Sequence, residues 1–222
     1  MKESYSVIPA LLSKTDEDFE EKLTQLSKFA DVIHVDLADG IAVPNRTVNL
    51  QYIFETIKSS RIILHMMVID PAKQLTAVGD LPQSLEEVIV HPEFTPNIYE
   101  VITYLKEKEI AVSLALSPLI KDHTTLTEIS QYLELIKSVM FMPIIPGFIG
   151  QPFRESVLED ISIARKYSNE LEIAVDGGIN PGSLASSYLA GARIFYASSY
   201  VLRSGDPEHA LEELRSVEID SR

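Results

Sequence analysis

The sequence alternates short apolar segments with longer amphipathic ones, and this alternation constrains the fold more than any other feature. It recurs about eight times, with a repeat of roughly 27 residues. The short segments, rich in β-branched residues, predict strands at residues 5–10, 32–38, 61–68, 87–90, 110–116, 138–142, 172–176 and 193–197. The longer segments predict helices at residues 15–29, 48–59, 96–108, 126–136, 154–167, 183–190 and 206–215, with one more beginning at Pro71.

A chain that alternates strands and helices forms a parallel sheet with helical crossovers. Eight such units in 222 residues fit a single domain, residues 1–222, folded as a (β/α)8 or TIM barrel near the lower size limit of that fold. A doubly wound open sheet is the alternative. We favour the barrel because polar side chains from the second, third and seventh strands converge only if the sheet closes on itself.

Composition narrows the possible partners. The net charge of −14 disfavours nucleic acid and anionic membranes, because both need a basic face. The absence of cysteine excludes disulfides and thiolate metal ligands. The N-terminal sequence MKESYSVIPALLSK is too short and polar for a signal peptide, and no apolar run approaches the ~20 residues of a membrane span. We therefore expect a cytoplasmic protein that binds neither nucleic acid nor membranes.

Three of the expected strands carry histidine or aspartate at or near their C-terminal ends. His34 and Asp36 lie two residues apart on one strand, and so on the same face. His65 lies in the next strand, and Asp176 ends the seventh. A barrel would bring these ends to one mouth, where two imidazoles and two carboxylates suit one divalent metal ion, Zn, Fe, Mn or Co. For His34 and Asp36 taken alone, a hydrogen-bonded core histidine beside a helix-capping aspartate is an equally good interpretation.

The other three histidines are not expected to bind the metal. His91 ends a strand but directly precedes a proline, so we expect it at a loop or at the edge of the core rather than on a metal. His123 and His209 lie in polar stretches and are expected to face solvent.

The loops after the last three strands have the composition of a lid and a phosphate site. Residues 146–153 form a glycine-rich loop with an aromatic residue, which could fold over a substrate or be an ordinary long loop. The pairs Gly177–Gly178 and Ser198–Ser199 follow strands seven and eight, where this fold usually binds phosphate. Glycines let backbone N–H groups approach an anion, and a helix N-terminus adds a favourable dipole.

Seven segments, in order along nearly the whole chain, resemble the ribulose-phosphate 3-epimerase family. They are IPALLS, HVDLADGIAVPN, LHMMV, LALSP, MPIIPGFIGQPF, VDGGIN and the turn at residues 197–199. The resemblance implies a metal-dependent (β/α)8 barrel that acts on a pentulose 5-phosphate. It implies that Asp36 and Asp176 are the catalytic acid and base, and that both hold the metal together with His34 and His65.

The motifs and the resemblance together assign a substrate pocket. The expected substrate-binding and phosphate-binding residues are His65, Gly147, Phe148, Ile149, Gly150, Gly177, Gly178, Ser198 and Ser199, and the expected substrate wall is Ala10, Ala38, Met67 and Met142. The chain departs from the family at Ala10 (usually serine), Ala38 (usually methionine), Ile145 (usually asparagine), and Asn49, Ile149 and Ser198 (usually glycine). The metal set is intact, and the substrate wall is altered.

We therefore expect an isomerase of carbohydrate metabolism, in the pentose phosphate pathway, that interconverts D-ribulose 5-phosphate and D-xylulose 5-phosphate. The two carboxylates would transfer protons through a metal-stabilised enediolate. Ala10, Ala38 and Ile145 motivate an alternative, a 3-epimerase of another ketose phosphate such as allulose 6-phosphate. A non-catalytic phospholigand-binding barrel is the third hypothesis, which the retention of both carboxylates disfavours. The expected partners are a sugar phosphate and other copies of the chain in a homo-oligomer.

Overall fold

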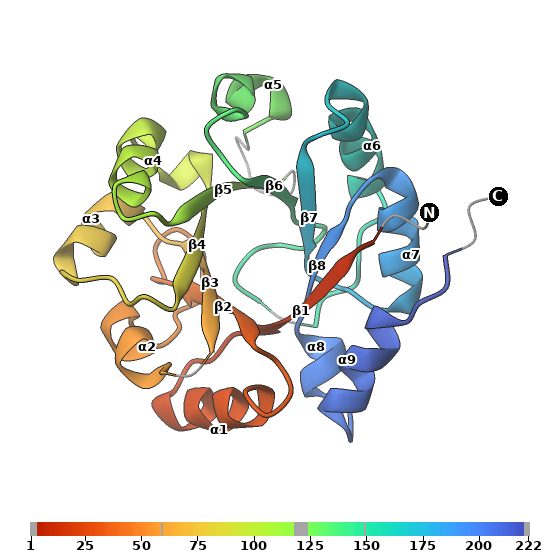
Figure 1. Cartoon of the computed structure of the whole chain (residues 1–222), viewed down its shortest axis with the longest axis horizontal. Helices are drawn as coiled ribbons and strands as arrows, with labels where there is room; N and C mark the ends of the chain where they lie inside the picture. The colour runs from red at the N-terminus through yellow and green to blue at the C-terminus, as the bar shows by residue number, and fades with distance from the viewer. Residues whose placement is uncertain (1–3, 59, 118–123, 149, 220–222) are drawn as a thin grey trace.

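Eight parallel strands form a closed ring in the computed structural model, which describes residues 4–58, 60–117, 124–148 and 150–219 (Figure 1). The strands are β1 (Ser6–Leu11), β2 (Val32–Ala38), β3 (Arg61–Met67), β4 (Leu85–Val90), β5 (Ala111–Leu116), β6 (Ser138–Phe141), β7 (Glu172–Asp176) and β8 (Ile194–Ala197). Each pairs with the next, and β1 pairs with β8, which closes the sheet. The expected (β/α)8 barrel is confirmed, and the open sheet is excluded.

Helices surround the ring on its outer side (Figure 1). They are α1 (Asp16–Leu26), α2 (Leu50–Thr56), α3 (Pro71–Ala77), α4 (Ile98–Lys106), α5 (Leu126–Ile129), α6 (Val157–Tyr167), α7 (Pro181–Ala190), α8 (Ser199–Leu202) and α9 (Pro207–Arg215), with 3-10 turns η1 (Pro92–Phe94) and η2 (Ser130–Tyr132). Many of these helices begin after a capping residue whose side chain accepts a hydrogen bond from a backbone N–H group of the first turn. Asn49, Asn97, Asn180 and Asp206 are such caps. Apart from the segment 126–136, the element ends lie within three residues of those expected.

The prediction of a helix over residues 126–136 was wrong beyond the first turn. Only α5 is α-helical, and the chain tightens into η2 before an irregular segment leads to β6. Of the α5 and η2 residues only Ile129 is buried, so a longer helix would have little apolar surface to pack. The Ser130 hydroxyl also donates to the Thr127 carbonyl, a local bond that competes with the helical pattern.

Apolar side chains pack in two layers, one on each face of the barrel wall. Residues of the outer face pack against the helices, and Leu64, Val88 and Ile161 are typical members. Residues of the inner face fill the ring, where Ile63, Met140 and Tyr196 meet. A filled ring is a packed core rather than a channel, so a ligand can bind only at its ends. Among the described residues, no helix has the length and apolar character needed to cross a bilayer.

A buried carboxylate lies near the N-terminal end of the barrel. Glu87 of β4 accepts hydrogen bonds from the Ser113 hydroxyl at 2.5 Å and from the Lys137 ammonium at 2.7 Å. Ser138, the first residue of β6, donates to Ser113 through its backbone N–H at 3.1 Å. These bonds join β4, β5 and β6 at one end and leave the other end free for a site.

Candidate active site

Strand register brings four polar side chains together at the C-terminal end of the barrel. Asp36 of β2 lies directly beside His65 of β3 in the sheet, and His34 precedes Asp36 by two residues on the same inner face. Asp176 is the last residue of β7. Both imidazoles are fully buried, and each aspartate is only 6% exposed. The predicted set of four residues from three strands therefore lies in one place.

The four side chains point their donor atoms at one another. His65 Nδ1 lies 2.8 Å from Asp36 Oδ1 and 3.6 Å from Asp176 Oδ2, and His34 Nε2 lies 3.2 Å from Asp36 Oδ1. One donor atom from each residue lies within 4.8 Å of the other three. Four ligands at about 2.1 Å from one ion would be roughly 3.4 Å apart, so the set could hold a divalent metal ion.

The environment separates the pKa values of the two carboxylates. Burial favours the neutral form of Asp36, but hydrogen bonds from His34 and His65 outweigh it and lower the pKa of Asp36. Burial and then repulsion from Asp36 raise the pKa of Asp176 to about 6. Burial disfavours the charged form of His34, yet its hydrogen bond to Asp36 raises its pKa. Carboxylates whose pKa values are driven apart in this way are suited to serve as base and acid.

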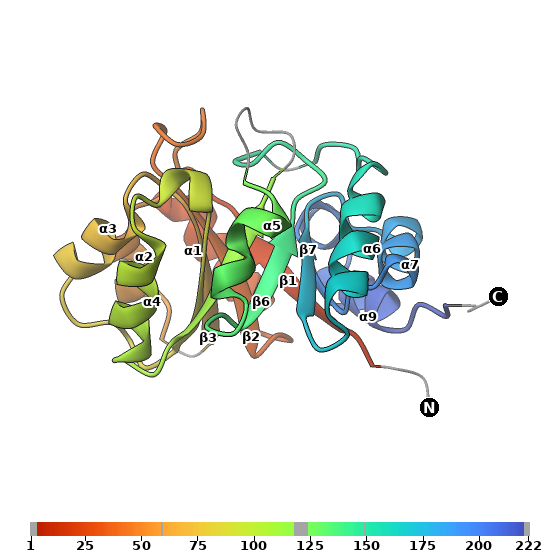
Figure 2. The ribbon, with the colours of Figure 1, turned by 90° about the horizontal axis from the view of Figure 1, so that it is seen from above.

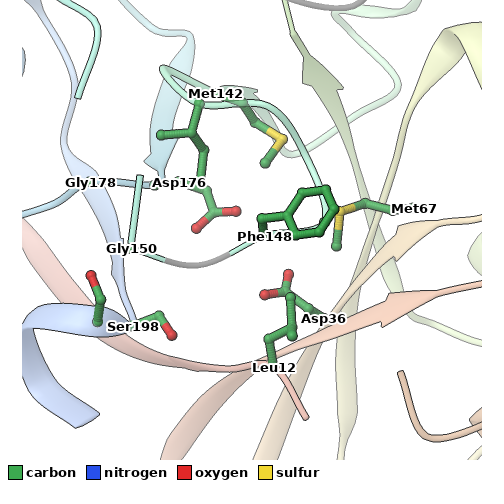
Figure 3. A pocket seen from close by; sticks show the side chains of 13 residues that line it. Leu12, Asp36, Met67, Met142, Phe148, Gly150, Asp176, Gly178 and Ser198 are labelled. Carbon is green, nitrogen blue, oxygen red and sulfur yellow. The ribbon is translucent and has the colours of Figure 1, made fainter. Parts of the chain in front are cut away.

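A small cavity of about 20 Å³ opens between the two carboxylates. Figure 3 shows Asp36 and Asp176 on opposite sides of it, with the ring of Phe148 between Met67 and Met142. The complete lining is Leu12, Asp36, Met67, Met142, Ile144, Gly147, Phe148, Gly150, Asp176, Gly177, Gly178, Ser198 and Ser199. The wall is thus apolar on one side and formed by glycine and serine on the other.

The loop after β6 covers this cavity, on the same side of the barrel as the connection after β2 (Figure 2). The Asn45 side chain donates to the Gly147 carbonyl and so joins the two connections. Gln151 donates to the carbonyls of Ile145 at 2.7 Å and of Phe148 at 3.0 Å, which closes the loop on itself. The loop predicted as a lid therefore covers the carboxylates.

A second, wider hollow of about 290 Å³ adjoins the cavity and shares Gly150, Gly178 and Ser199 with it. The side chain of Arg203, at the end of α8, lines this hollow and forms no hydrogen bond or ion pair with any residue that the structure describes. Gly150 has φ +77°, a backbone conformation that favours glycine, and a Cβ there would lie 2.7 Å from Arg203 Nη1, so the loop backbone passes close to the guanidinium. The hollow combines an available cation with backbone groups, which suits an anion.

Most of the predicted pocket residues line the cavity, and some do not. Gly147, Phe148, Gly150, the two glycines after β7, Ser198, Ser199, Met67 and Met142 all do so. Ala10 packs instead inside the barrel, and Ala38 packs against Val43 and Met67. His209 is exposed as expected, whereas Ile149 and His123 lie outside the described residues.

The structure also brings in residues that the sequence analysis did not assign to the site. Leu12 and Ile144 line the cavity, and both follow directly from the predicted pattern because each lies just beyond the end of a strand. His91 was expected away from the metal, and it is fully buried directly behind His65. No sequence signal placed Arg203, because a short helix after a strand does not reveal where its side chains point.

Fold and site together define a class of protein: a (β/α)8 barrel with two carboxylates and two imidazoles gathered at its mouth in a set that could hold a metal ion. The model of the ribulose-phosphate 3-epimerase family matches residues 6–202. The chain belongs to that family, whose members are isomerases acting on carbohydrates, and the expectation from its motifs is confirmed.

Individual proteins agree with this assignment. The ribulose-phosphate 3-epimerase of Bacillus subtilis is 29% identical over 94% of this chain and 97% of its own length. That of Buchnera aphidicola is 32% identical over 96% of this chain and 94% of its own length. A solved structure of 3-hexulose-6-phosphate synthase covers 96% of this chain and 99% of its own, with 18% identity and a TM-score of 0.67, which supports the barrel fold.

Proposed function

We propose that this epimerase interconverts D-ribulose 5-phosphate and D-xylulose 5-phosphate, with a divalent metal ion held by the four-residue cluster. The observation that carries the proposal is the convergence of His34, Asp36, His65 and Asp176, with donor atoms within 4.8 Å, in a chain of this family. The donor set of nitrogen and carboxylate oxygen suits Zn, Fe, Mn or Co. Bound there, the ion would act as a Lewis acid and stabilise the negative charge of the enediolate.

Inversion at C3 requires removal of a proton from one face of the carbon and its replacement from the other. Asp36 and Asp176 extend from strands on opposite sides of the cavity, so each can reach one face (Figure 3). In one direction one carboxylate is the base and the other the acid, and in the reverse direction the roles exchange. The apolar wall of Met67, Met142 and Phe148 excludes water, which would otherwise protonate the intermediate without stereochemical control.

The phosphate group binds, in this proposal, in the hollow beside the catalytic cavity. The backbone N–H group of Gly178 and the side chain of Arg203 are the groups that would hold it there. With the overall charge at −14, such local positive groups are what allow an anionic substrate to bind. Binding of the phosphate in the neighbouring hollow fixes which carbon of the sugar faces the carboxylates.

The loop after β6 must open to admit the substrate. The cavity between the carboxylates measures about 20 Å³, close to the space of one water molecule, so a sugar does not fit while the loop is closed. Opening needs the loss of the bond from Asn45 to Gly147. Closure over the bound sugar would then exclude water.

A coupled assay for D-xylulose 5-phosphate tests the proposal, with the metal-loaded protein and the Asp176→Asn variant measured side by side. Turnover by the wild type that exceeds the variant by at least about 100-fold is expected, since an acid–base residue contributes roughly that much. A panel of C5 and C6 ketose phosphates addresses substrate choice, which Ala38 and Ile145 leave open. If the protein converts only a C6 ketose phosphate, then that sugar and not D-ribulose 5-phosphate is the substrate. If it converts none of them, the proposal is refuted.

A further inference from the structure

Behind His65, on the side away from the carboxylates, lies a second pair of an imidazole and a carboxylate. His65 Nε2 is 2.9 Å from His91 Nε2, and His91 Nδ1 is 3.1 Å from Glu93 Oε1. Both rings are fully buried, and the Glu93 side chain is 7% exposed. The other oxygen of Glu93 is buried with no hydrogen-bond partner among the described residues. Nothing in the proposed reaction uses this pair.

The local sequence holds the pair in place. Pro92 begins the 3-10 turn η1, which folds Glu93 back toward the ring of His91. The Phe94 N–H donates to the His91 carbonyl at 3.1 Å, and the Thr95 hydroxyl donates to the same carbonyl at 2.7 Å. The proline that suggested an ordinary loop is therefore the residue that builds the turn.

Hydrogen-bond chemistry decides which group donates and which accepts along the series His65, His91 and Glu93. Two ring nitrogens 2.9 Å apart can bond only if one carries a proton and the other offers a lone pair. His65 directs Nδ1 at Asp36 and Asp176, so a metal in the cluster would take the Nδ1 lone pair and leave the ring proton on Nε2. His65 Nε2 then donates to His91 Nε2. The proton of His91 must accordingly be on Nδ1, where the Glu93 carboxylate accepts it.

The other imidazole ligand is oriented differently. The His34 ring packs against the ring of Tyr196 at a centroid distance of 4.1 Å, and its Nδ1 has no hydrogen-bond partner in the described part of the chain. Packing fixes His34, whereas only hydrogen bonding selects the tautomer of a ring. The two ligands therefore differ in what supports them.

We infer that His91 and Glu93 are positioning residues of the metal site, which select the tautomer and the orientation of His65 so that Nδ1 faces the metal ion. The inference rests on the proposed function in taking the four-residue cluster as the metal site. A metal-bound histidine usually donates its second ring N–H directly to a carboxylate or a carbonyl. Here a further imidazole, that of His91, lies between His65 and the carboxylate of Glu93, so that Glu93 acts on the ion through two rings. Neither residue is expected to touch the substrate.

Binding of Co²⁺ to the metal-free full-length protein tests this inference without any turnover. The dissociation constant comes from competition with a chelator, and the visible spectrum of Co²⁺ reports the ligand geometry. We expect His91→Leu to weaken binding by about 10–100-fold and to change the spectrum, as loss of such a partner typically does. Glu93→Gln should weaken binding in the same direction by a smaller factor. His91→Gln should recover most of the affinity, because its amide oxygen can accept the His65 proton.

A double variant shows whether Glu93 acts through His91. In the His91→Leu background, Glu93→Gln should cause no further loss of Co²⁺ affinity, because the connecting ring is gone. Glu87→Gln is the matched control: it also removes a buried carboxylate from the β4 region, but Glu87 bonds to Ser113 and Lys137 rather than to the four-residue cluster, so the change should preserve the Co²⁺ spectrum and alter the affinity far less than His91→Leu does.

The outcomes separate this inference from the proposed function. Unchanged Co²⁺ affinity and spectrum in both Glu93→Gln and His91→Leu would overturn the inference alone. Full additivity in the double variant would also overturn it. Failure of the wild type to bind Co²⁺ would overturn the metal site and the inference with it. Tight Co²⁺ binding with no turnover of any ketose phosphate would refute only the proposed function.

Discussion

The two aspartates at the barrel mouth differ in the contacts that their carboxylates make. Asp36 is held by two imidazoles, whereas Asp176 has one longer contact to His65, at 3.6 Å. Burial raises the pKa of both carboxyl groups, but the two hydrogen bonds outweigh it at Asp36 and lower its pKa, whereas burial and repulsion from Asp36 raise the pKa of Asp176 to about 6. The pKa values of two residues of the same type are thus shifted in opposite directions by burial and by the groups around them.

Arg203 provides a test of the phosphate site at the level of one residue. Replacement by glutamine in Arg203→Gln should raise KM for the sugar phosphate about tenfold, because a charge-assisted hydrogen bond to phosphate is worth roughly 1.5 kcal/mol. The turnover number should change little, since Arg203 is distant from the reacting carbon in this proposal. Steady-state kinetics and inhibition by inorganic phosphate provide the measurement.

Arg61→Gln is the control for this substitution, because Arg61 begins β3 at the opposite end of the barrel and pairs with Glu86. It should leave KM unchanged. An Arg203 variant with the KM of the wild type and undiminished inhibition by phosphate would exclude the arginine from the site.

Among the structural elements, strands and loops contribute to different properties. The N-terminal ends of β4, β5 and β6 are joined through Glu87, which is only 1% exposed. We expect Glu87→Gln to lower the free energy of unfolding by about 1–3 kcal/mol, because the Ser113 and Lys137 bonds lose their charged acceptor. Urea denaturation measures this loss. A change below about 0.5 kcal/mol would mean that the cluster contributes nothing to stability.

Helices and strands could be predicted from the sequence where one of their faces is buried, because burial of one face spaces the apolar residues regularly along the chain. Each strand has an inner and an outer face, and α4 presents Val101, Ile102 and Leu105 to the core, so their patterns are strong. The segment 126–136 lacked this constraint, because Ile129 is the only buried residue of α5 and η2. Local hydrogen bonds there decided the structure instead.

The site was predictable where it follows from strand register, and not where it depends on loop geometry. His34, Asp36, His65 and Asp176 come from strand ends, whose positions the barrel fixes. His91 gave the same signal, and the following proline was interpreted as a loop marker although it forms the turn that supports the ring. The direction of the Arg203 side chain depends on tertiary contacts that the sequence does not display.

For the molecule as a whole, the metal ion and the fold should stabilise each other. The four ligands come from β2, β3 and β7, so an ion would cross-link distant parts of the ring. At a metal concentration about 100-fold above Kd, binding adds about 2.7 kcal/mol. Removal of the ion by a chelator should then lower Tm by about 5–10 °C for a chain of this size.

Differential scanning calorimetry with and without chelator measures this shift. Asp176→Asn removes one ligand and should abolish most of the metal-dependent difference. If the wild type melts at the same temperature in both conditions, then the cluster does not bind metal in the folded protein.

The most direct test of the central claim follows hydrogen exchange at C3 of D-ribulose 5-phosphate in deuterated water, by proton NMR with metal-loaded protein. The claim is that one of the carboxylates Asp36 and Asp176 removes the proton from one face of C3 and the other delivers a different, solvent-exchangeable proton to the opposite face. Wild-type protein should replace the C3 proton with deuterium, and Asp36→Asn and Asp176→Asn should each slow the exchange by at least about 100-fold. Absence of exchange with the wild type, or undiminished exchange in both variants, would contradict the account.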